Sequence, residues 1–171
     1  TILFSVRHRT ASRNTGRVFG NEKEIYNMLV SGGPDIGVKQ TDLSTLSLSL
    51  QIELVQWSKI YLGAHGAGLT WVLFMRPEST LIEILPFYRT DNYFRNLARL
   101  SGVNYVPFNE NSVSCHGESA TIWVNVKQLR HIVDVVVRSA RSTIGGKPYC
   151  GLSSMCMINS FTNALPQNPC T

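Results

Sequence analysis

Short apolar segments and amphipathic segments alternate along most of this chain, and that alternation constrains the fold more than any other feature. Short apolar runs predict strands, and apolar residues at a helical period, bounded by Gly or Pro, predict helices. The predicted strands are 2–6, 36–38, 59–63, 80–85, 103–108 and 121–126, and the predicted helices are 22–31, 69–75, 91–100 and 126–140. Strands that alternate with helices through short connections form βαβ units. We therefore predict an α/β fold with a Rossmann-like, mostly parallel sheet and flanking helices.

One leucine-rich segment, residues 43–57, fits two different periods. Every second residue from Leu46 to Leu54 is apolar, which is the period of a strand. A helical face is formed instead by Leu43, Leu46, Leu50, Leu54 and Trp57. Because strands average five or six residues, the length favours a helix. Asp42 or Ser44 is the candidate N-cap of that helix.

The chain has 171 residues, of which 43% are hydrophobic and 16% are charged. These values are typical of a globular domain and exclude a disordered chain, a coiled coil and collagen-like repeats. The longest uncharged apolar stretch, residues 60–75, is shorter than the ~20 residues that a membrane-spanning helix needs. We predict one domain over residues 1–145 and a tail over 146–171. Because the chain begins inside a predicted strand without Met, we expect a piece of a longer protein.

The cysteines gather towards the predicted tail and are Cys115, Cys150, Cys156 and Cys170. They form no C-x-x-C pair, and their only neighbouring histidine is His116, so the spacing does not predict a zinc site. Four cysteines allow three complete disulfide pairings, and the sequence does not choose among them. Their clustering favours a disulfide-stapled tail and an oxidising compartment.

Five basic side chains and no acidic ones lie within the first 17 residues: Arg7, His8, Arg9, Arg13 and Arg17. Two interpretations stay open. The segment is either a solvated loop or an anion site, because guanidinium groups bind phosphate oxygens through paired donors. The remaining charge is mixed, and the net charge is +5. A nucleic-acid surface needs a larger basic face with interleaved aromatic residues, so we predict no nucleic-acid partner.

A glycine-rich turn, Gly63-Ala64-His65-Gly66-Ala67-Gly68, joins a predicted strand to a predicted short helix. Glycines let the backbone approach a ligand closely, and the N–H groups at the start of the helix favour a phosphate. The spacing is neither that of a P-loop nor G-x-G-x-x-G, and a tight turn without a ligand stays an alternative. A histidine-glycine turn also occurs in the oxyanion loop of esterases. The G-x-S-x-G nucleophile motif of those enzymes is absent from the sequence.

His65 and Glu83 are the candidate groups for acid–base chemistry or hydroxyl recognition. His65 lies inside the glycine turn, where it is either a hydrogen-bonded structural residue or a ligand contact. Glu83 lies within an apolar strand, where a carboxylate is costly unless it is paired. It is either an ion-pair partner of Arg7 or Arg13 or an acceptor for a ribose or sugar hydroxyl. No Asp-x-Asp pair occurs, so arginines and backbone amides would have to neutralise a bound diphosphate.

Three sequence blocks resemble the signature of glycosyltransferase family 61. The blocks are Gly63 to Thr70, Leu73 to Pro77 and Leu81 to Ile84. Supporting matches are Arg7, Arg13, Asn21-Glu22, Gln51, Tyr93, Leu97, Gly102 and Tyr105, so that the resemblance covers Ile2 to Phe108. Trp71 departs from the family, which commonly has Asn there, and the part after Gly145 has no counterpart.

The resemblance implies the donor-binding half of a GT-B fold, with a missing N-terminal lobe of the same protein as its partner. It implies an inverting, metal-independent glycosyltransferase without a cofactor. Such an enzyme transfers GlcNAc, xylose or arabinose from a UDP-sugar to a hydroxyl of a glycan or glycoprotein. The Golgi or ER lumen, and a type II membrane or secreted parent protein, follow from the same resemblance. The alternatives are a non-catalytic nucleotide-sugar-binding or scaffold domain and a dehydrogenase, although the dehydrogenase motif G-x-G-x-x-G is missing.

The predicted donor and diphosphate site consists of Arg7, Arg13, Gly63, His65, Gly66, Ala67, Gly68, Leu69, Thr70 and Glu83. Parallel strands place the loop after the first strand and the glycine turn at one edge of the sheet. His65 is the candidate general base, with a base on the absent lobe as the alternative. Arg9 and Arg17 have no counterpart in the family pattern, so we expect their loss to matter less. No metal ligand is predicted.

Overall fold

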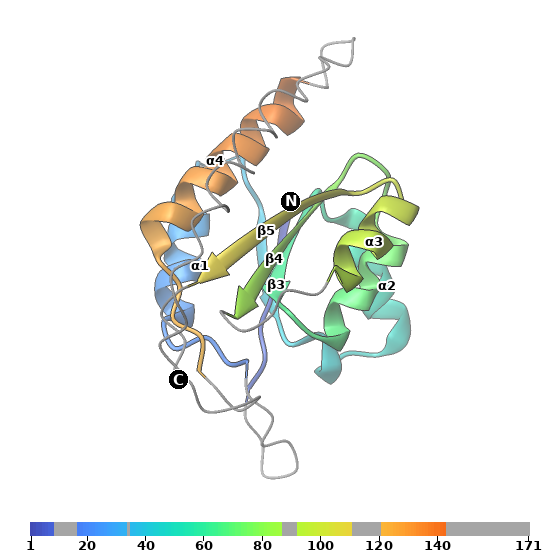
Figure 1. Cartoon of the computed structure of the whole chain (residues 1–171), viewed down its shortest axis with the longest axis horizontal. Coiled ribbons are helices and arrows are strands. Elements are labelled where there is room, and N and C mark those ends of the chain that lie inside the picture. The colour runs from blue at the N-terminus through green and yellow to red at the C-terminus, as the bar shows by residue number, and fades with distance from the viewer. Residues whose placement is uncertain (9–16, 34, 87–91, 111–120, 143–171) are drawn as a thin grey trace.

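A computed structural model describes residues 1–8, 17–33, 35–86, 92–110 and 121–142. Its centre is a five-stranded sheet in which all neighbouring strands are parallel, with the order β2-β1-β3-β4-β5 (Figure 1). The strands are β1 (Ile2–Ser5), β2 (Val38–Thr41), β3 (Ile60–Ala64), β4 (Thr80–Pro86) and β5 (Asn104–Glu110). The predicted α/β fold with a Rossmann-like parallel sheet is therefore confirmed.

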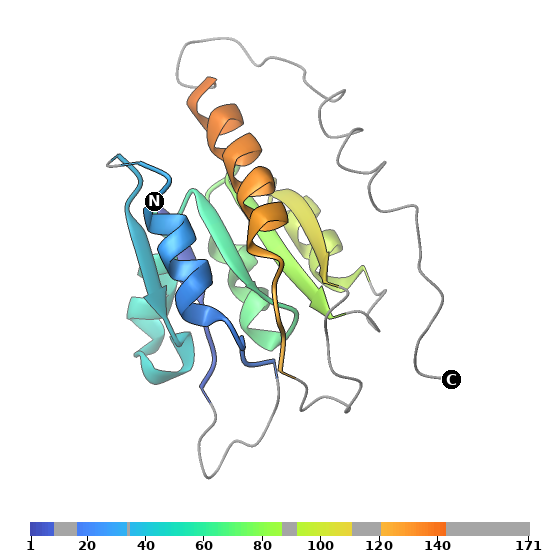
Figure 2. The ribbon, with the colours of Figure 1, turned by 90° about the vertical axis from the view of Figure 1, so that its left-hand side faces the viewer.

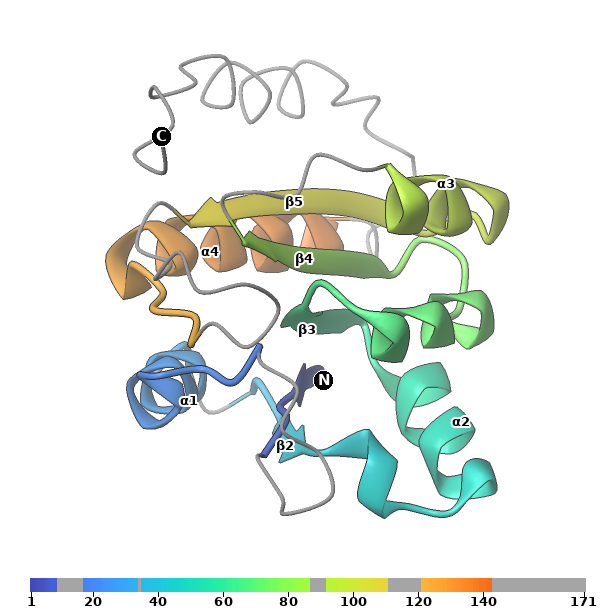
Figure 3. The same cartoon turned by 60° about the horizontal axis from the view of Figure 1, so that its bottom comes forward.

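Helices cover both faces of the sheet (Figure 3). One face carries α1 (Glu22–Val30) and α4 (Val126–Ser142), which lie side by side (Figure 2). The other face carries α2 (Leu48–Trp57), the 3-10 helix η2 (Ala67–Phe74) and α3 (Tyr93–Leu100). The chain adds β2 on one side of β1 and then adds β3, β4 and β5 on the other side. Right-handed crossovers in these opposite directions place the helices on opposite faces.

Each face of the sheet buries its own apolar core. Successive strand residues point to opposite faces, so strands covered on both sides are apolar throughout. Phe4, Leu62 and Ile84 contribute to the core under α1 and α4. Leu3, Tyr61 and Leu81 contribute to the core under α2, η2 and α3. The two cores hold the central strands rigidly, and their carboxyl ends carry the candidate site.

The ambiguous leucine-rich segment is confirmed as helical, but it is divided in two. Asp42 accepts a hydrogen bond from the Ser44 amide at 3.0 Å and begins the short 3-10 helix η1 (Leu43–Thr45). Ser47 then caps α2 by accepting a hydrogen bond from the Leu50 amide at 3.4 Å. The predicted N-cap of the long helix at Asp42 or Ser44 is therefore wrong, because those residues build a separate turn.

Two predicted strands are corrected by the structure. The second strand begins at Val38 rather than at residue 36. Residues 121–126 form no strand, and only Ile122 pairs there, in a single bridge with Phe19. This pairing cannot extend, because the chain after Phe19 turns into α1 within three residues.

Asn21 occupies the predicted N-cap position of α1 but makes no capping hydrogen bond. Its side-chain Nδ2 instead donates to the Val124 carbonyl at 2.8 Å, and its Oδ1 accepts from the Val124 amide at 3.0 Å. These two bonds tie the segment before α4 to the start of α1, across 103 residues of sequence.

The predicted tail over 146–171 and the cysteines Cys115, Cys150, Cys156 and Cys170 lie outside the described residues. The division into a domain and a tail, and the disulfide bonds, stay predictions. Among the helices of the described ranges, none is both long and apolar enough to cross a membrane.

Candidate functional site

The strand order reverses between β1 and β3. The chain leaves β1 for α1 on one face, and it leaves β3 for η2 on the other face (Figure 3). The two connections therefore diverge at the carboxyl ends of two neighbouring strands. In open parallel sheets with the order 2-1-3-4-5, ligands bind at this topological switch point. The fold thus selects the end of β1 and the glycine turn as the place for a ligand.

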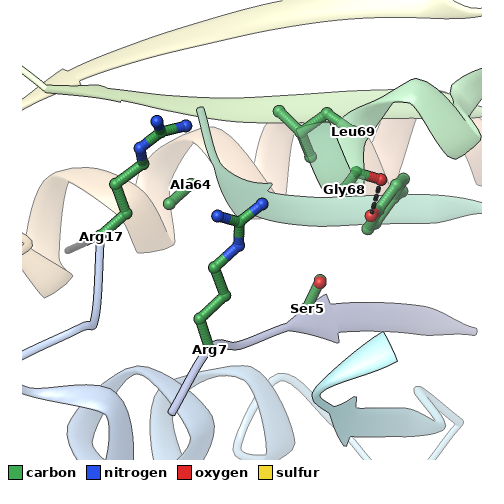
Figure 4. A pocket seen from close by; sticks show the side chains of 7 residues that line it. Ser5, Arg7, Arg17, Ala64, Gly68 and Leu69 are labelled. Atoms are coloured by element: carbon green, nitrogen blue, oxygen red, sulfur yellow. Dashed lines mark hydrogen bonds between the residues drawn. The ribbon is translucent and has the colours of Figure 1, made fainter. Parts of the chain in front are cut away.

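A small pocket, partly open to solvent, lies at this switch point (Figure 4). Its lining residues come from β1, the segment before α1, β3 and the start of η2. They are Ser5, Arg7, Arg17, Tyr61, Ala64, Gly68 and Leu69. The lining contains two guanidinium groups and no carboxylate. A concave surface lined by one sign of charge attracts the opposite sign, so the pocket favours an anion.

The two arginines reach the glycine turn from the opposite side of the pocket (Figure 4). A Cβ atom at Gly66 would lie 3.0 Å from Nη2 of Arg7 and closer still to Nη1 of Arg17. Gly66 also has a φ of 154°, a conformation that residues with a Cβ rarely adopt. Nη1 of Arg17 donates to the carbonyl oxygen of His65 at 2.8 Å. The glycine is therefore needed both for its backbone conformation and for the space that the guanidinium groups occupy.

Tyr61 anchors the far end of the glycine turn from inside β3. Its hydroxyl donates to the Gly68 carbonyl at 2.8 Å. Burial raises the pKa of the Tyr61 phenol far above its usual value, while the Ser5 hydroxyl and the Arg7 charge act in the opposite direction. The phenol therefore keeps its proton and stays a hydrogen-bond donor at neutral pH.

His65 belongs to a buried cluster on the α3 side of the sheet. Its Nδ1 lies 2.6 Å from Oε1 of Glu83, and the Tyr105 hydroxyl donates to Oε2 of the same carboxylate at 2.6 Å. Glu83 is only 1% exposed. The His65 ring meets the Phe94 ring edge-on at 5.2 Å between centroids. A carboxylate at Nδ1 holds the proton on that nitrogen, so Nε2 is the atom of His65 that can accept or release a proton.

The predicted site residues fall into three environments. Those at the pocket are Arg7, Gly66, Gly68 and Leu69. His65 and Glu83 form the buried cluster. Of the others, Gly63 is buried within β3, Ala67 is exposed and Thr70 is half-buried in η2. Arg13 lies outside the described residues. The roles of all these residues in donor binding stay predictions.

The predicted ion pair of Glu83 with Arg7 is wrong, and its alternative partner Arg13 lies outside the described residues. The two oxygens of the Glu83 carboxylate are bonded instead to His65 and Tyr105. Glu83 therefore contacts the glycine turn through His65.

Sequence analysis does not identify Ser5, Arg17 and Tyr61 as parts of the site. Tyr61 carried a usable signal, since a buried phenol in an apolar strand needs a hydrogen-bond partner. Ser5 is the last residue of β1 and sits at the edge where loops gather. Arg17 is set aside in the sequence because it has no family counterpart, yet the structure places it beside Arg7 (Figure 4).

Known proteins with similar sequences are glycosyltransferases. The alpha-1,3-arabinosyltransferase XAT3 of Oryza sativa subsp. japonica is 34% identical over 110 residues, which cover 61% of this chain and 18% of that protein. The xylan glycosyltransferase MUCI21 of Arabidopsis thaliana is 33% identical over 97 residues, or 55% of this chain and 19% of that protein. The EGF domain-specific O-linked N-acetylglucosamine transferase of Gallus gallus is 31% identical over 87 residues, or 50% of this chain and 16% of that protein.

The chain thus spans about a fifth of the length of these curated relatives. Residues 2–82 match the family model described as Glycosyltransferase 61. The matched segment contains β1, Arg7, Arg17 and the whole glycine turn. Residues 2–82 of this chain therefore belong to glycosyltransferase family 61.

Proposed function

We propose that this protein is an inverting, metal-independent glycosyltransferase. It transfers GlcNAc, xylose or arabinose from a UDP-sugar to a hydroxyl of a glycan or glycoprotein. The observation that carries the proposal is the cationic pocket at the β1/β3 switch point, where Arg7 faces the glycine turn. Family membership supports the reaction class, and the names of the relatives supply the three sugars.

The pocket would stabilise the leaving diphosphate. When the bond between the sugar and UDP breaks, negative charge grows on the phosphate oxygens. Preorganised donors that point at this charge lower the barrier, because they need no reorganisation during the reaction. Arg7 supplies a fixed positive charge and paired N–H donors, which suits phosphate oxygens. The diphosphate would therefore lie between Arg7 and the Gly66–Gly68 segment, with Arg13 as a further ligand predicted from the family pattern.

His65 is the proposed general base within this lobe. An inverting transfer needs a base to remove the proton of the acceptor hydroxyl while the sugar–phosphate bond breaks. With Nδ1 bonded to Glu83, Nε2 of His65 can take that proton. The resulting imidazolium would be stabilised by the Glu83 carboxylate, which Tyr105 holds in place. A base on the N-terminal lobe is the alternative.

The proposed acceptor site and cellular compartment depend on parts of the protein outside this chain. We place this chain as the donor-binding half of a GT-B fold, with an N-terminal lobe of the same protein supplying most of the acceptor site. The matched region is 18% of one relative and 19% of another, which leaves room for such a lobe in those proteins. The Golgi or ER lumen is the proposed location, with a type II membrane or secreted parent protein.

A non-catalytic nucleotide-sugar-binding domain is the second candidate, and Trp71 is the observation behind it. Trp71 stands where the family commonly has Asn. Its ring packs 5.5 Å from that of Phe74 and against the core under η2, and it does not line the pocket. This substitution therefore fills the core without blocking the place for the diphosphate, which is why we prefer the enzyme.

Calorimetry with UDP and with NAD, each with and without EDTA, tests the proposal. We expect UDP to bind with an affinity that EDTA does not change. NAD binding without UDP binding would contradict the proposal and favour a dehydrogenase. We expect this chain to be inactive without its N-terminal lobe, so UDP release from UDP-GlcNAc, UDP-xylose and UDP-arabinose is measured on the protein that carries that lobe. Release in the presence of xylan or glycoprotein acceptors then distinguishes the enzyme from the binding domain. UDP binding with no release in any combination would favour the binding domain.

A further inference from the structure

We propose that Arg17 is a second ligand of the donor diphosphate and that it couples the bound phosphate to the backbone of His65. This inference rests on the proposed function. It adds a binding residue that the family pattern leaves out, and it gives that residue a link to the candidate base.

The first argument is the position of the guanidinium group. Arg17 lines the pocket together with Arg7, and both groups approach the same glycine, Gly66 (Figure 4). Two like charges this close repel each other. A diphosphate carries the negative charge that would relieve this repulsion. In the described part of the chain, the ion pairs are His8–Glu22 and His65–Glu83, and neither includes Arg17.

The second argument is the number of donors. A guanidinium group has five N–H donors. Arg17 donates from Nη1 to the His65 carbonyl oxygen at 2.8 Å, which leaves further N–H groups on the same planar fork for phosphate oxygens. The hydrogen bond to His65 orients the guanidinium group across the pocket. This bond does not have to break when an anion binds to the other N–H groups. The Arg17 side chain would then bind both the phosphate and the backbone carbonyl of the candidate base His65.

The third argument is the backbone at Arg17. Its φ is 75°, in the left-handed region that is strained for a residue with a Cβ. Neighbouring bonds impose this conformation, since Ile122 donates to the Val18 carbonyl and accepts from the Gly20 amide, both at 2.8 Å. The Trp123 ring lies directly over Gly20 and leaves no room for a Cβ there. Strain that the surroundings enforce marks functional positions, and here it aims the Arg17 side chain into the pocket.

Binding of three probes to Arg17 variants tests the inference. UDP, inorganic pyrophosphate and uridine are titrated into the protein, into Arg17→Gln and into the control Arg99→Gln, which removes an exposed arginine from α3. We expect Arg17→Gln to weaken UDP and pyrophosphate roughly 10- to 100-fold and to leave uridine within about twofold. Arg17→Lys keeps the positive charge but not the paired N–H donors of the guanidinium group. It should therefore weaken UDP binding less than Arg17→Gln does. Arg99→Gln should leave all three affinities unchanged.

A glycine variant separates binding from a merely structural role. Arg17→Gly relieves the strained φ, so it should unfold at the same or a higher temperature than the unmodified protein. We nevertheless expect it to lose UDP affinity as severely as Arg17→Gln. UDP affinity that rises or falls with the unfolding temperature across the Gly, Gln and Lys variants would overturn the inference.

Protection from phenylglyoxal gives a second measurement on the unmodified protein, which does not depend on how variants fold. Mass spectrometry of the labelled peptides should show that UDP and pyrophosphate protect Arg17 and Arg7, that uridine protects neither, and that Arg99 is labelled equally throughout. Protection of Arg7 without protection of Arg17 would overturn this inference alone. If the unmodified protein binds neither UDP nor pyrophosphate, the proposed function and this inference both fail.

Discussion

Two regions meet at the glycine turn, and they differ in burial and in charge balance. The cluster of His65, Glu83 and Tyr105 is enclosed, and its carboxylate is bonded at both oxygens. The arginine pocket, with the half-buried Arg7 and Arg17, is partly open to solvent and carries positive charge without a carboxylate in its lining. An enclosed cluster suits proton transfer, because its geometry and tautomer are set beforehand. An open cationic pocket suits a charged ligand that must enter and leave.

The same turn serves both regions through different atoms. The ring of His65 points to the carboxylate of Glu83, while its backbone carbonyl accepts the hydrogen bond of Arg17. A short glycine-rich segment can do this because its backbone lies between the sheet and the arginine side chains. The comparison teaches that proton transfer and charge stabilisation should respond separately to mutation, although they lie within one turn.

The largest effect should come from the enclosed cluster. In His65→Gln the side-chain amide can still donate to Glu83, but it cannot accept a proton. If His65 is the base, turnover should fall about 10²- to 10⁴-fold while UDP affinity changes by less than about threefold. UDP release in the presence of acceptor measures the first quantity, and calorimetry measures the second. Turnover within a few-fold of the unmodified protein would place the base on the other lobe.

The next largest effect should come from the arginine pocket, where a substitution should weaken UDP binding. Arg7→Ala removes a charge-assisted contact to the diphosphate, so UDP should bind roughly 10- to 100-fold more weakly. Uridine has no diphosphate and should bind almost unchanged. Arg95→Ala, which removes an exposed arginine on α3, is the matched control. Equal losses for UDP and uridine would show that Arg7 does not contact phosphate. The same experiment on Arg13 tests the prediction made from the family pattern.

A smaller effect should appear when the support of the cluster is removed. Tyr105→Phe deletes the hydroxyl that donates to Oε2 of Glu83 at 2.6 Å and leaves the ring in place. With that bond lost, the carboxylate holds His65 less firmly, and kcat should fall about 3- to 10-fold. The donor KM should stay the same, since Tyr105 does not line the pocket. A change in KM without a change in kcat would contradict the assignment of turnover to the His65 cluster and of donor binding to the arginine pocket.

The sequence predicts the fold better than it predicts the site. Strands and helices follow from apolar periods, and the glycine turn follows from its composition, so the switch point could be located in advance. The partner of Glu83 could not be predicted, because strand periodicity does not tell which of several basic side chains a carboxylate contacts. The place of Arg17 in the pocket could not be predicted either, because its left-handed backbone is fixed by tertiary bonds of Val18 and Gly20 to Ile122. Family resemblance identifies residues of a common pattern, and it is silent about a residue outside that pattern.

The smallest expected effect concerns Tyr61, which links the two regions by donating to the Gly68 carbonyl. Burial raises the pKa of this phenol. Above about pH 10 the unfolded chain releases the Tyr61 proton while the folded protein keeps it, so rising pH favours unfolding. This group alone should lower the free energy of unfolding by about 1.4 kcal/mol per pH unit there, and below pH 10 its contribution is constant.

Tyr61→Phe removes both the hydrogen bond and this titration. At neutral pH the variant should be about 1 kcal/mol less stable, because the Gly68 carbonyl loses its donor. Between pH 10 and pH 11 the difference in stability between the two proteins should shrink and then change sign. Only in the unmodified protein does the unfolded chain release the Tyr61 proton, which favours unfolding. Urea unfolding at pH 7, 10 and 11 measures both quantities, and Tyr93→Phe, which removes a hydroxyl from an exposed residue, is the control. Parallel curves for the unmodified protein and Tyr61→Phe at alkaline pH would show that the phenol titrates in the folded protein. Tyr61 would then be too accessible to brace the turn that separates the proton-transfer cluster from the arginine pocket.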